Sequence, residues 1–172
     1  MRHLHFGKLF FVVFSLLLAY TVSARKPIKT LLITGQNNHN WQVSHVVLKQ
    51  ILENSGRFDV DFVISPEQGK DMSGFVLDFS PYQLVVLDYN GDSWPEETNR
   101  RFLEYVQNGG GVVIYHAADN AFSKWPEFNR ICALGGWEGR NENSGPYVYW
   151  KDGKLVKDSS AGVGGSHGRQ HE

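Results

Sequence analysis

The sequence predicts a single α/β domain built on a doubly wound, mostly parallel sheet. Three observations carry this prediction. The 172 residues suffice for one domain with its own core. Short apolar strands alternate with amphipathic helical segments along the chain. The strand in residues 83–90 contains a continuous apolar run of the kind buried on both faces, and a further short apolar strand follows in residues 111–116.

The first 24 residues are expected to be a secretory signal peptide and not part of the fold. Arg2 and Lys8 precede the apolar run 9–22, and the small residues of "VSA" favour cleavage after Ala24. An uncleaved membrane anchor is the alternative, although the run is short for a membrane span. We therefore expect an exported protein, periplasmic or extracellular, with a domain over residues 25–172.

Composition and charge make several classes of function unexpected for this chain. Removing residues 1–24 takes away two of the 17 basic residues and none of the 18 acidic ones, which leaves a net charge of −3. This charge gives no reason to expect nucleic acid or an anionic membrane as a partner. Cys132 is the only cysteine, which excludes an internal disulfide, and it lies in a predicted apolar helix. The chain contains no P-loop and no G-x-G-x-x-G motif.

The first half of the chain reads as strand, helix, strand, strand. Residues 29–34 ("KTLLIT") and 57–65 ("RFDVDFVIS") are predicted strands. The helix between them is expected to bury one stripe of apolar residues, namely Val43, Val46, Val47, Ile51 and Leu52. The secondary structure of segment 66–81 is ambiguous, and a short helix with a loop is one interpretation.

The second half of the chain continues the alternation of helices and strands. Ser93 and Glu96 have the spacing of a capping box for a helix that ends at Gly109. "GVVIYH" is the next strand, and a short helix is expected to begin at Pro126. Asp152-Gly153 predicts the turn of a final hairpin.

Polar and aromatic residues follow three strands at the point where each strand ends. Because ligands of open parallel sheets bind at the carboxyl ends of the strands, these residues are candidates for one site. They are His39 and Trp41 after the first strand, Asn90 and Trp94 after the third, and His116, Asp119 and Trp125 after the fourth.

Aromatic rings beside amides and carboxylates are typical of a carbohydrate site. Ring faces pack on the C–H surface of a sugar, while Asn, Asp and His bond its hydroxyls. The alternative is that Trp41, Trp94 and Trp125 only fix loops onto helix ends.

His116 stands at a strand-to-helix turn, where a nucleophile elbow presents its reactive residue. It could act as a general base with Asp119 nearby, bind a metal, or be a structural residue. His167 and His171 are four residues apart and could join His116 around a divalent metal such as zinc, or be merely solvated.

Several separated motifs resemble the ThuA-like family, named for trehalose utilisation. They are "LDYNGDSW", "YVQNGGGVVIYHAADNAF", "WPEFNRICALGGWEGR", "GPYVYW" and "GSHGRQHE". The resemblance implies a flavodoxin-like, class I glutamine amidotransferase-like fold and a link to sugar metabolism. It also implies that the chain is a fragment, incomplete at the C-terminus.

By the same resemblance, His116 stands where amidotransferases carry a catalytic cysteine, which disfavours glutaminase activity. The pocket residues that it implies are His39, Trp41, Asn90, His116, Asn129, Arg130, Trp137, Gly139, Arg140, His167 and His171. Two functions remain open: an enzyme acting on a sugar derivative, and a non-catalytic sugar-binding or sensing module.

Overall fold

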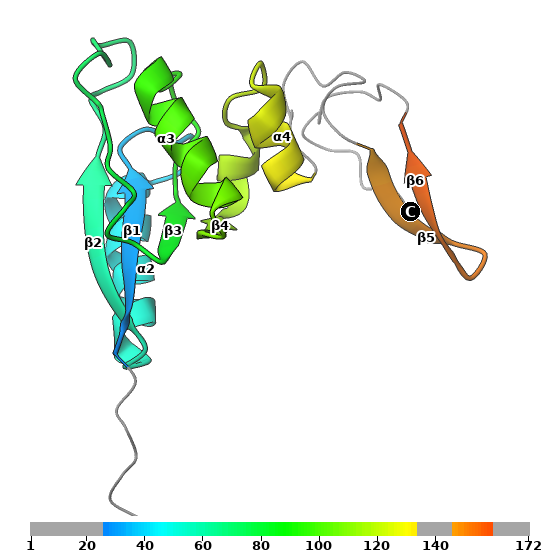
Figure 1. Ribbon diagram of the computed structural model, residues 1–172, viewed down its shortest axis with the longest axis horizontal. Helices are drawn as coiled ribbons and strands as arrows, with labels where there is room; N and C mark the ends of the chain where they lie inside the picture. The colour runs from blue at the N-terminus through cyan, green and yellow to red at the C-terminus, as the bar shows by residue number, and fades with distance from the viewer. Residues whose placement is uncertain (1–25, 134–145, 160–172) are drawn as a thin grey trace, which may run out of the picture.

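The computed structural model describes residues 26–133 and 146–159. Its main element is a four-stranded parallel sheet in the order β2-β1-β3-β4 (Figure 1). The strands are β1 (Ile28–Thr34), β2 (Phe58–Ile64), β3 (Leu84–Leu87) and β4 (Gly111–Ile114). All three pairings are parallel, with Leu32 opposite Val86 and Val86 opposite Val113. The predicted doubly wound α/β fold is confirmed.

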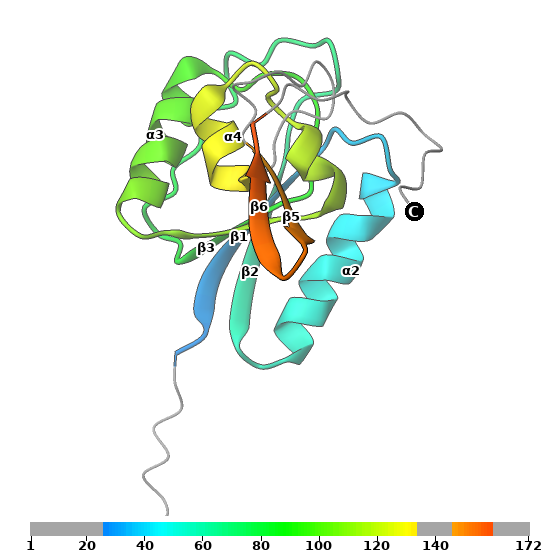
Figure 2. The same cartoon turned by 90° about the vertical axis from the view of Figure 1, so that its right-hand side faces the viewer.

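Helices cover both faces of this sheet. Helix α2 (Trp41–Asn54) lies on one face, and α3 (Glu96–Gln107) and α4 (Pro126–Cys132) lie on the other (Figure 2). Side chains alternate along each strand, so Leu32 and Val86 face α2, whereas Ile33 and Val85 face the larger core beneath α3 and α4. The proline at the start of α4 occupies the first-turn position that the sequence predicts.

The predicted buried stripe of α2 is wrong for four of its five residues. Val43 is 54% exposed and Ile51 is 62% exposed, and Val46 and Val47 are exposed as well. Leu52 is half-buried against the sheet as predicted, and the same face carries the buried His45 and the half-buried Leu48.

Polar contacts explain why α2 turns another face toward the sheet than the sequence predicts. Ser44 Oγ donates to Asp88 Oδ2 over 2.5 Å, and Lys49 Nζ donates to the carbonyl of Val60. These bonds turn Ser44 and Lys49 toward β3 and β2. The helix is apolar on two sides, and periodicity alone cannot tell which side is buried.

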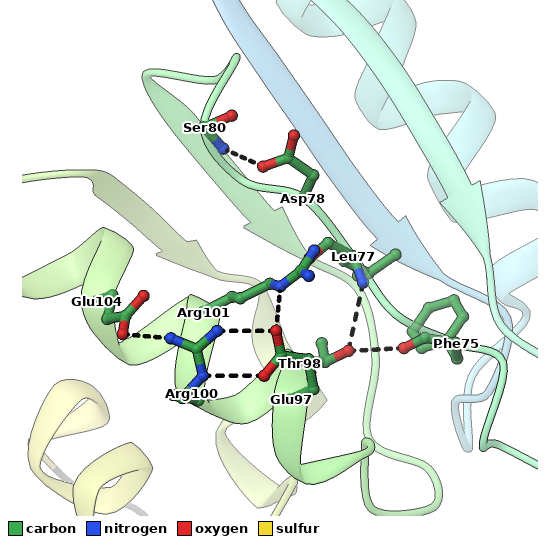
Figure 3. Close-up of polar contacts among 9 residues, drawn as sticks. All are labelled: Phe75, Leu77, Asp78, Ser80, Glu97, Thr98, Arg100, Arg101 and Glu104. Carbon is green, nitrogen blue, oxygen red and sulfur yellow. Dashed lines mark hydrogen bonds and ion pairs between the residues drawn. The ribbon is translucent and has the colours of Figure 1, made fainter.

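Segment 65–83 contains no helix or strand and is held by α3 (Figure 3). Thr98 Oγ1 donates to the carbonyl of Phe75 over 2.7 Å and accepts from the amide of Leu77 over 3.3 Å. The guanidinium groups of Arg100 and Arg101 bind Glu97 and hold the pKa of that carboxyl down at about 2.

Helix α3 begins differently from the prediction. Its N-cap is Pro95, which makes no side-chain capping hydrogen bond, so the predicted Ser93–Glu96 capping box does not form. Phe102 on the inner face of the helix is completely buried.

The predicted hairpin is confirmed. Strands β5 (Tyr147–Lys151) and β6 (Lys154–Asp158) pair antiparallel as a separate two-stranded sheet. Asp152 and Gly153 both have positive φ, at 51° and 73°, as a type I′ turn requires. Within the described residues, no helix has the length and apolar character needed to cross a membrane.

Candidate functional site

Three loops meet at the carboxyl edge of the sheet because β1, β3 and β4 run parallel (Figure 1). The first loop covers residues 35–40, the second 88–95 and the third 115–125. We call them the β1 loop, the β3 loop and the β4 loop. They bring most of the candidate site residues of the described chain to one edge.

Several hydrogen bonds join the β1 and β3 loops. Asn37 Nδ2 donates to Asp88 Oδ1 over 3.0 Å, and Asn90 Nδ2 donates to Asn38 Oδ1 over 3.0 Å. Gln36 Oε1 accepts from the backbone amide of Asp92 over 2.7 Å. Both loops therefore form a rigid platform.

Asp88 is the structural centre of this platform. The residue is 1% exposed and accepts hydrogen bonds from Asn37 and Ser44. Burial raises the pKa of this carboxyl, and the hydrogen bonds oppose that effect. Because its oxygens already bind the β1 loop and α2, Asp88 holds the site together and does not face a ligand.

The β4 loop presents His116 in a conformation that histidine rarely adopts. Its φ is +47°, in the left-handed region, and it begins a 3-10 helix over His116–Asn120. Ala117 and Ala118 are buried beneath it. The imidazole is exposed, and its ring centroid lies 4.7 Å from that of His39 on the β1 loop. The turn thus joins two histidines that are remote in sequence.

Asp119 lies on the same 3-10 helix and interacts electrostatically with His116. Burial raises the pKa of the Asp119 carboxyl, and the nearby His116 opposes the rise.

Burial, with the Asp119 charge as a second cause, raises the pKa of the Cys132 thiol to about 12. The thiol therefore stays protonated at neutral pH, which agrees with the expectation that Cys132 is a core residue and not a nucleophile.

A cavity of about 600 Å³ lies between the β3 loop, the β4 loop and α3. It is lined by polar groups and two aromatic rings, contributed by Gln68, Asn90, Gly91, Asp92, Ser93, Asn99, Asn120, Phe122, Ser123, Lys124 and Trp125. The buried Oδ1 atoms of Asn99 and Asn120 have no hydrogen-bond partner among the described residues.

Two of the predicted substrate-binding residues, Asn90 and Trp125, line this cavity. Trp125 is half-buried, and its ring stacks on Phe128 at 5.7 Å between centroids. His39, His116 and Asp119 lie beside the cavity and not in its lining. Asn90 connects the two areas, because it borders the cavity and bonds the residue before His39.

The prediction for Trp94 is wrong. This residue is 3% exposed, and its ring packs edge-on against Phe122 at 4.8 Å and against Phe102 at 5.8 Å. No ring face is left for a ligand, so Trp94 fixes a loop onto the core, as the alternative interpretation had it.

The other predicted residues are dispersed. Trp41 begins α2 and packs near His45, with 5.9 Å between ring centroids. Asn129 is buried, and its Nδ2 donates to the carbonyl of Ser123 over 3.3 Å, whereas Arg130 is exposed on α4. Trp137, Gly139, Arg140, His167 and His171 lie outside the described residues.

Asn99 and Lys124 line the cavity but were not predicted from the sequence, whereas Asn120 stands in the strand-end segment that the strand-end rule indicates. Asn99 lies inside α3, where no strand-end rule applies. Over residues 26–133 and 146–159, no group of three or more His, Cys, Asp or Glu side chains is arranged to hold a metal ion. The predicted metal set of His116, His167 and His171 stays a prediction.

Comparison with known proteins supplies the family. No protein-family model and no curated protein matches the chain. The fold matches the crystal structure of a thua-like protein from Parabacteroides merdae ATCC 43184 with a TM-score of 0.78 and 99% sequence identity. The match covers 85% of this chain and 52% of that one, so the chain spans about half the length of the solved protein. The resemblance drawn from the sequence motifs is confirmed: the chain is similar to a thua-like protein over 85% of its own length.

Proposed function

We propose that this ThuA-like chain binds a carbohydrate or sugar derivative in the cavity between the β3 and β4 loops. The observation that carries the proposal is the cavity lining, in which the amide side chains of Asn90, Asn99 and Asn120 accompany the ring of Trp125. Amide groups both donate to and accept from sugar hydroxyls, and an aromatic ring packs on sugar C–H groups.

The remaining lining suits the same ligand class. Asn90, Ser93 and Gln68 offer both donors and acceptors, and the rings of Phe122 and Trp125 offer apolar surface for sugar C–H groups. Lys124 and Asp92 add one cation and one anion, so a sugar with a carboxylate or an amino group is also accommodated.

Isothermal titration and thermal shift against a panel of mono- and disaccharides and oxidised sugars test the proposal. A ligand at 100 times its Kd should raise the free energy of unfolding by about 2.7 kcal/mol. Asn99→Ala, on a helix that tolerates alanine, should weaken binding roughly fivefold or more. Asn54→Ala, an exposed amide at the end of α2, is the matched control. No shift with any sugar, or equal affinities for the two variants, would overturn the proposal.

A catalytic role for His116 is the second candidate, and its positive φ favours it. Backbone strain of this kind costs about 1–3 kcal/mol and is typical of functional sites. With Asp119 beside it, His116 would act as the acid–base group on a sugar held next to it. His116→Asn, which tolerates the left-handed conformation, should abolish turnover of a bound sugar while leaving its affinity nearly unchanged. Unchanged turnover in His116→Asn would contradict this catalytic role and leave a non-catalytic binding module as the function.

Glutaminase activity has no support from the chemistry at this turn. A histidine occupies the position that a nucleophilic cysteine would require, and the Cys132 thiol is protonated at neutral pH. Export through the predicted signal peptide over residues 1–24 remains part of the proposal, and loss of those residues from the secreted protein, measured by mass spectrometry, would test it.

A further inference from the structure

His39 and His116 form a pair of facing imidazoles at the carboxyl edge of the sheet. Their ring centroids are 4.7 Å apart and their planes are tilted by 33°. Both side chains are exposed, and they come from different loops. Neither is among the lining residues of the amide cavity, so the pair needs a separate explanation.

The backbone beneath both residues is fixed by other contacts. The amide of His39 donates to Asn37 Oδ1 over 3.0 Å, and Asn37 is itself bonded to the buried Asp88. On the other side, the amide of Tyr115 donates to the carbonyl of Leu87 over 2.9 Å, and His116 then turns into the 3-10 helix with positive φ. The two imidazoles are therefore brought together by the framework and not by chance encounter of mobile loops.

Neutral imidazole nitrogens are the preferred protein ligands of Zn²⁺ and Cu²⁺. The pair thus offers two ligand nitrogens from two fixed loops.

We propose that His39 and His116 together bind a first-row transition ion, Cu²⁺ or Zn²⁺. The site offers two protein nitrogens and leaves the remaining coordination positions to water or to an oxygen ligand. It differs from the histidine set suggested by the sequence, since His39 takes the place of His167 and His171. It also does not depend on sugar binding in the neighbouring cavity.

Titration of the purified mature chain, without residues 1–24, with Zn²⁺ and Cu²⁺, followed by calorimetry and electron paramagnetic resonance, tests this site. One ion per chain is expected, and the Cu²⁺ spectrum should show coupling to two imidazole nitrogens. His39→Ala and His116→Asn should each weaken binding at least tenfold and reduce the coupling to one nitrogen. Circular dichroism melts establish that both variants fold, and asparagine is chosen because it tolerates the left-handed backbone at position 116.

One further variant separates this proposal from the histidine set suggested by the sequence. The double variant His167→Ala/His171→Ala should bind the ion as tightly as the parent chain. Loss of binding in the double variant, unchanged binding in both single histidine variants, or no stoichiometric binding of either ion would overturn the proposal.

Discussion

The β3 and β4 loops leave neighbouring parallel strands at the same edge of the sheet, yet they are built in opposite ways. In the β3 loop, Asp88, Tyr89 and Trp94 are all buried, and Tyr89 donates its hydroxyl hydrogen to the carbonyl of Asp92 over 2.6 Å. In the β4 loop, His116 is exposed, and His116 and Phe122 both have positive φ, at 47° and 54°. The β3 loop anchors large side chains in the core, whereas the β4 loop holds two residues at positive φ, which costs stability.

The largest expected effect concerns the β3 loop. Trp94→Ala should lower the free energy of unfolding by about 3–5 kcal/mol, because it leaves a cavity among Phe75, Tyr89, Phe102 and Phe122. Urea denaturation measures this change. A loss below about 1 kcal/mol would contradict the structural role of the β3 loop.

Substitutions of Asp119 and Asp88 test the difference between the two loops through the pH dependence of the free energy of unfolding. Burial raises the pKa of Asp119 above its ordinary value of 3.8, so the folded state keeps a proton that the unfolded state has already released. The free energy of unfolding therefore falls as pH rises from the ordinary pKa to the raised one. Asp119→Asn should remove this fall and make the variant relatively more stable at pH 7 than at pH 3.5.

Asp88→Asn should behave differently, although burial raises the pKa of Asp88 as well. Its two oxygens accept from Asn37 and Ser44, and an amide keeps only one acceptor. We expect a loss of stability of about 1–3 kcal/mol at neutral pH. Urea denaturation of both variants between about pH 3.5 and 7 measures these free energies of unfolding. The same pH dependence in both variants would contradict the difference between the two loops.

A smaller effect is expected at the strained turn. His116→Gly should raise the free energy of unfolding by about 1 kcal/mol, because glycine adopts positive φ without a steric cost. Ala117→Gly, next to it and buried, is the control and should lower stability by a similar amount. If His116→Gly were as destabilising as Ala117→Gly, the turn would not be strained.

The sequence predicted the order of the elements, the parallel sheet and the hairpin well, because periodicity and glycine turns are local signals. It failed for α2, where apolar residues stand on two sides. There the hydrogen bond from Ser44 to Asp88, between residues remote in sequence, decides which side faces the sheet. Long-range contacts of that kind have no signature in a single sequence.

The site was predicted only in part for a similar reason. The strand-end rule correctly brings His39, Asn90, His116 and Trp125 to one edge, but it does not say whether a side chain points into the core or into solvent. Trp94 and Trp125 have the same chemistry and similar positions after their strands. Only the packing of Trp94 against Phe102 and Phe122 makes it a core residue.

The measurement that tests the contrast most directly is a thermal shift comparison of Trp94→Phe and Trp125→Phe, each with and without a sugar that binds the parent chain. We predict that Trp94→Phe lowers the melting temperature of the free protein while the sugar still raises it. Trp125→Phe should melt close to the parent chain, since phenylalanine still packs on Phe128, and should lose most of the sugar-dependent shift. The opposite pattern, with the sugar shift lost in Trp94→Phe and kept in Trp125→Phe, would contradict the account.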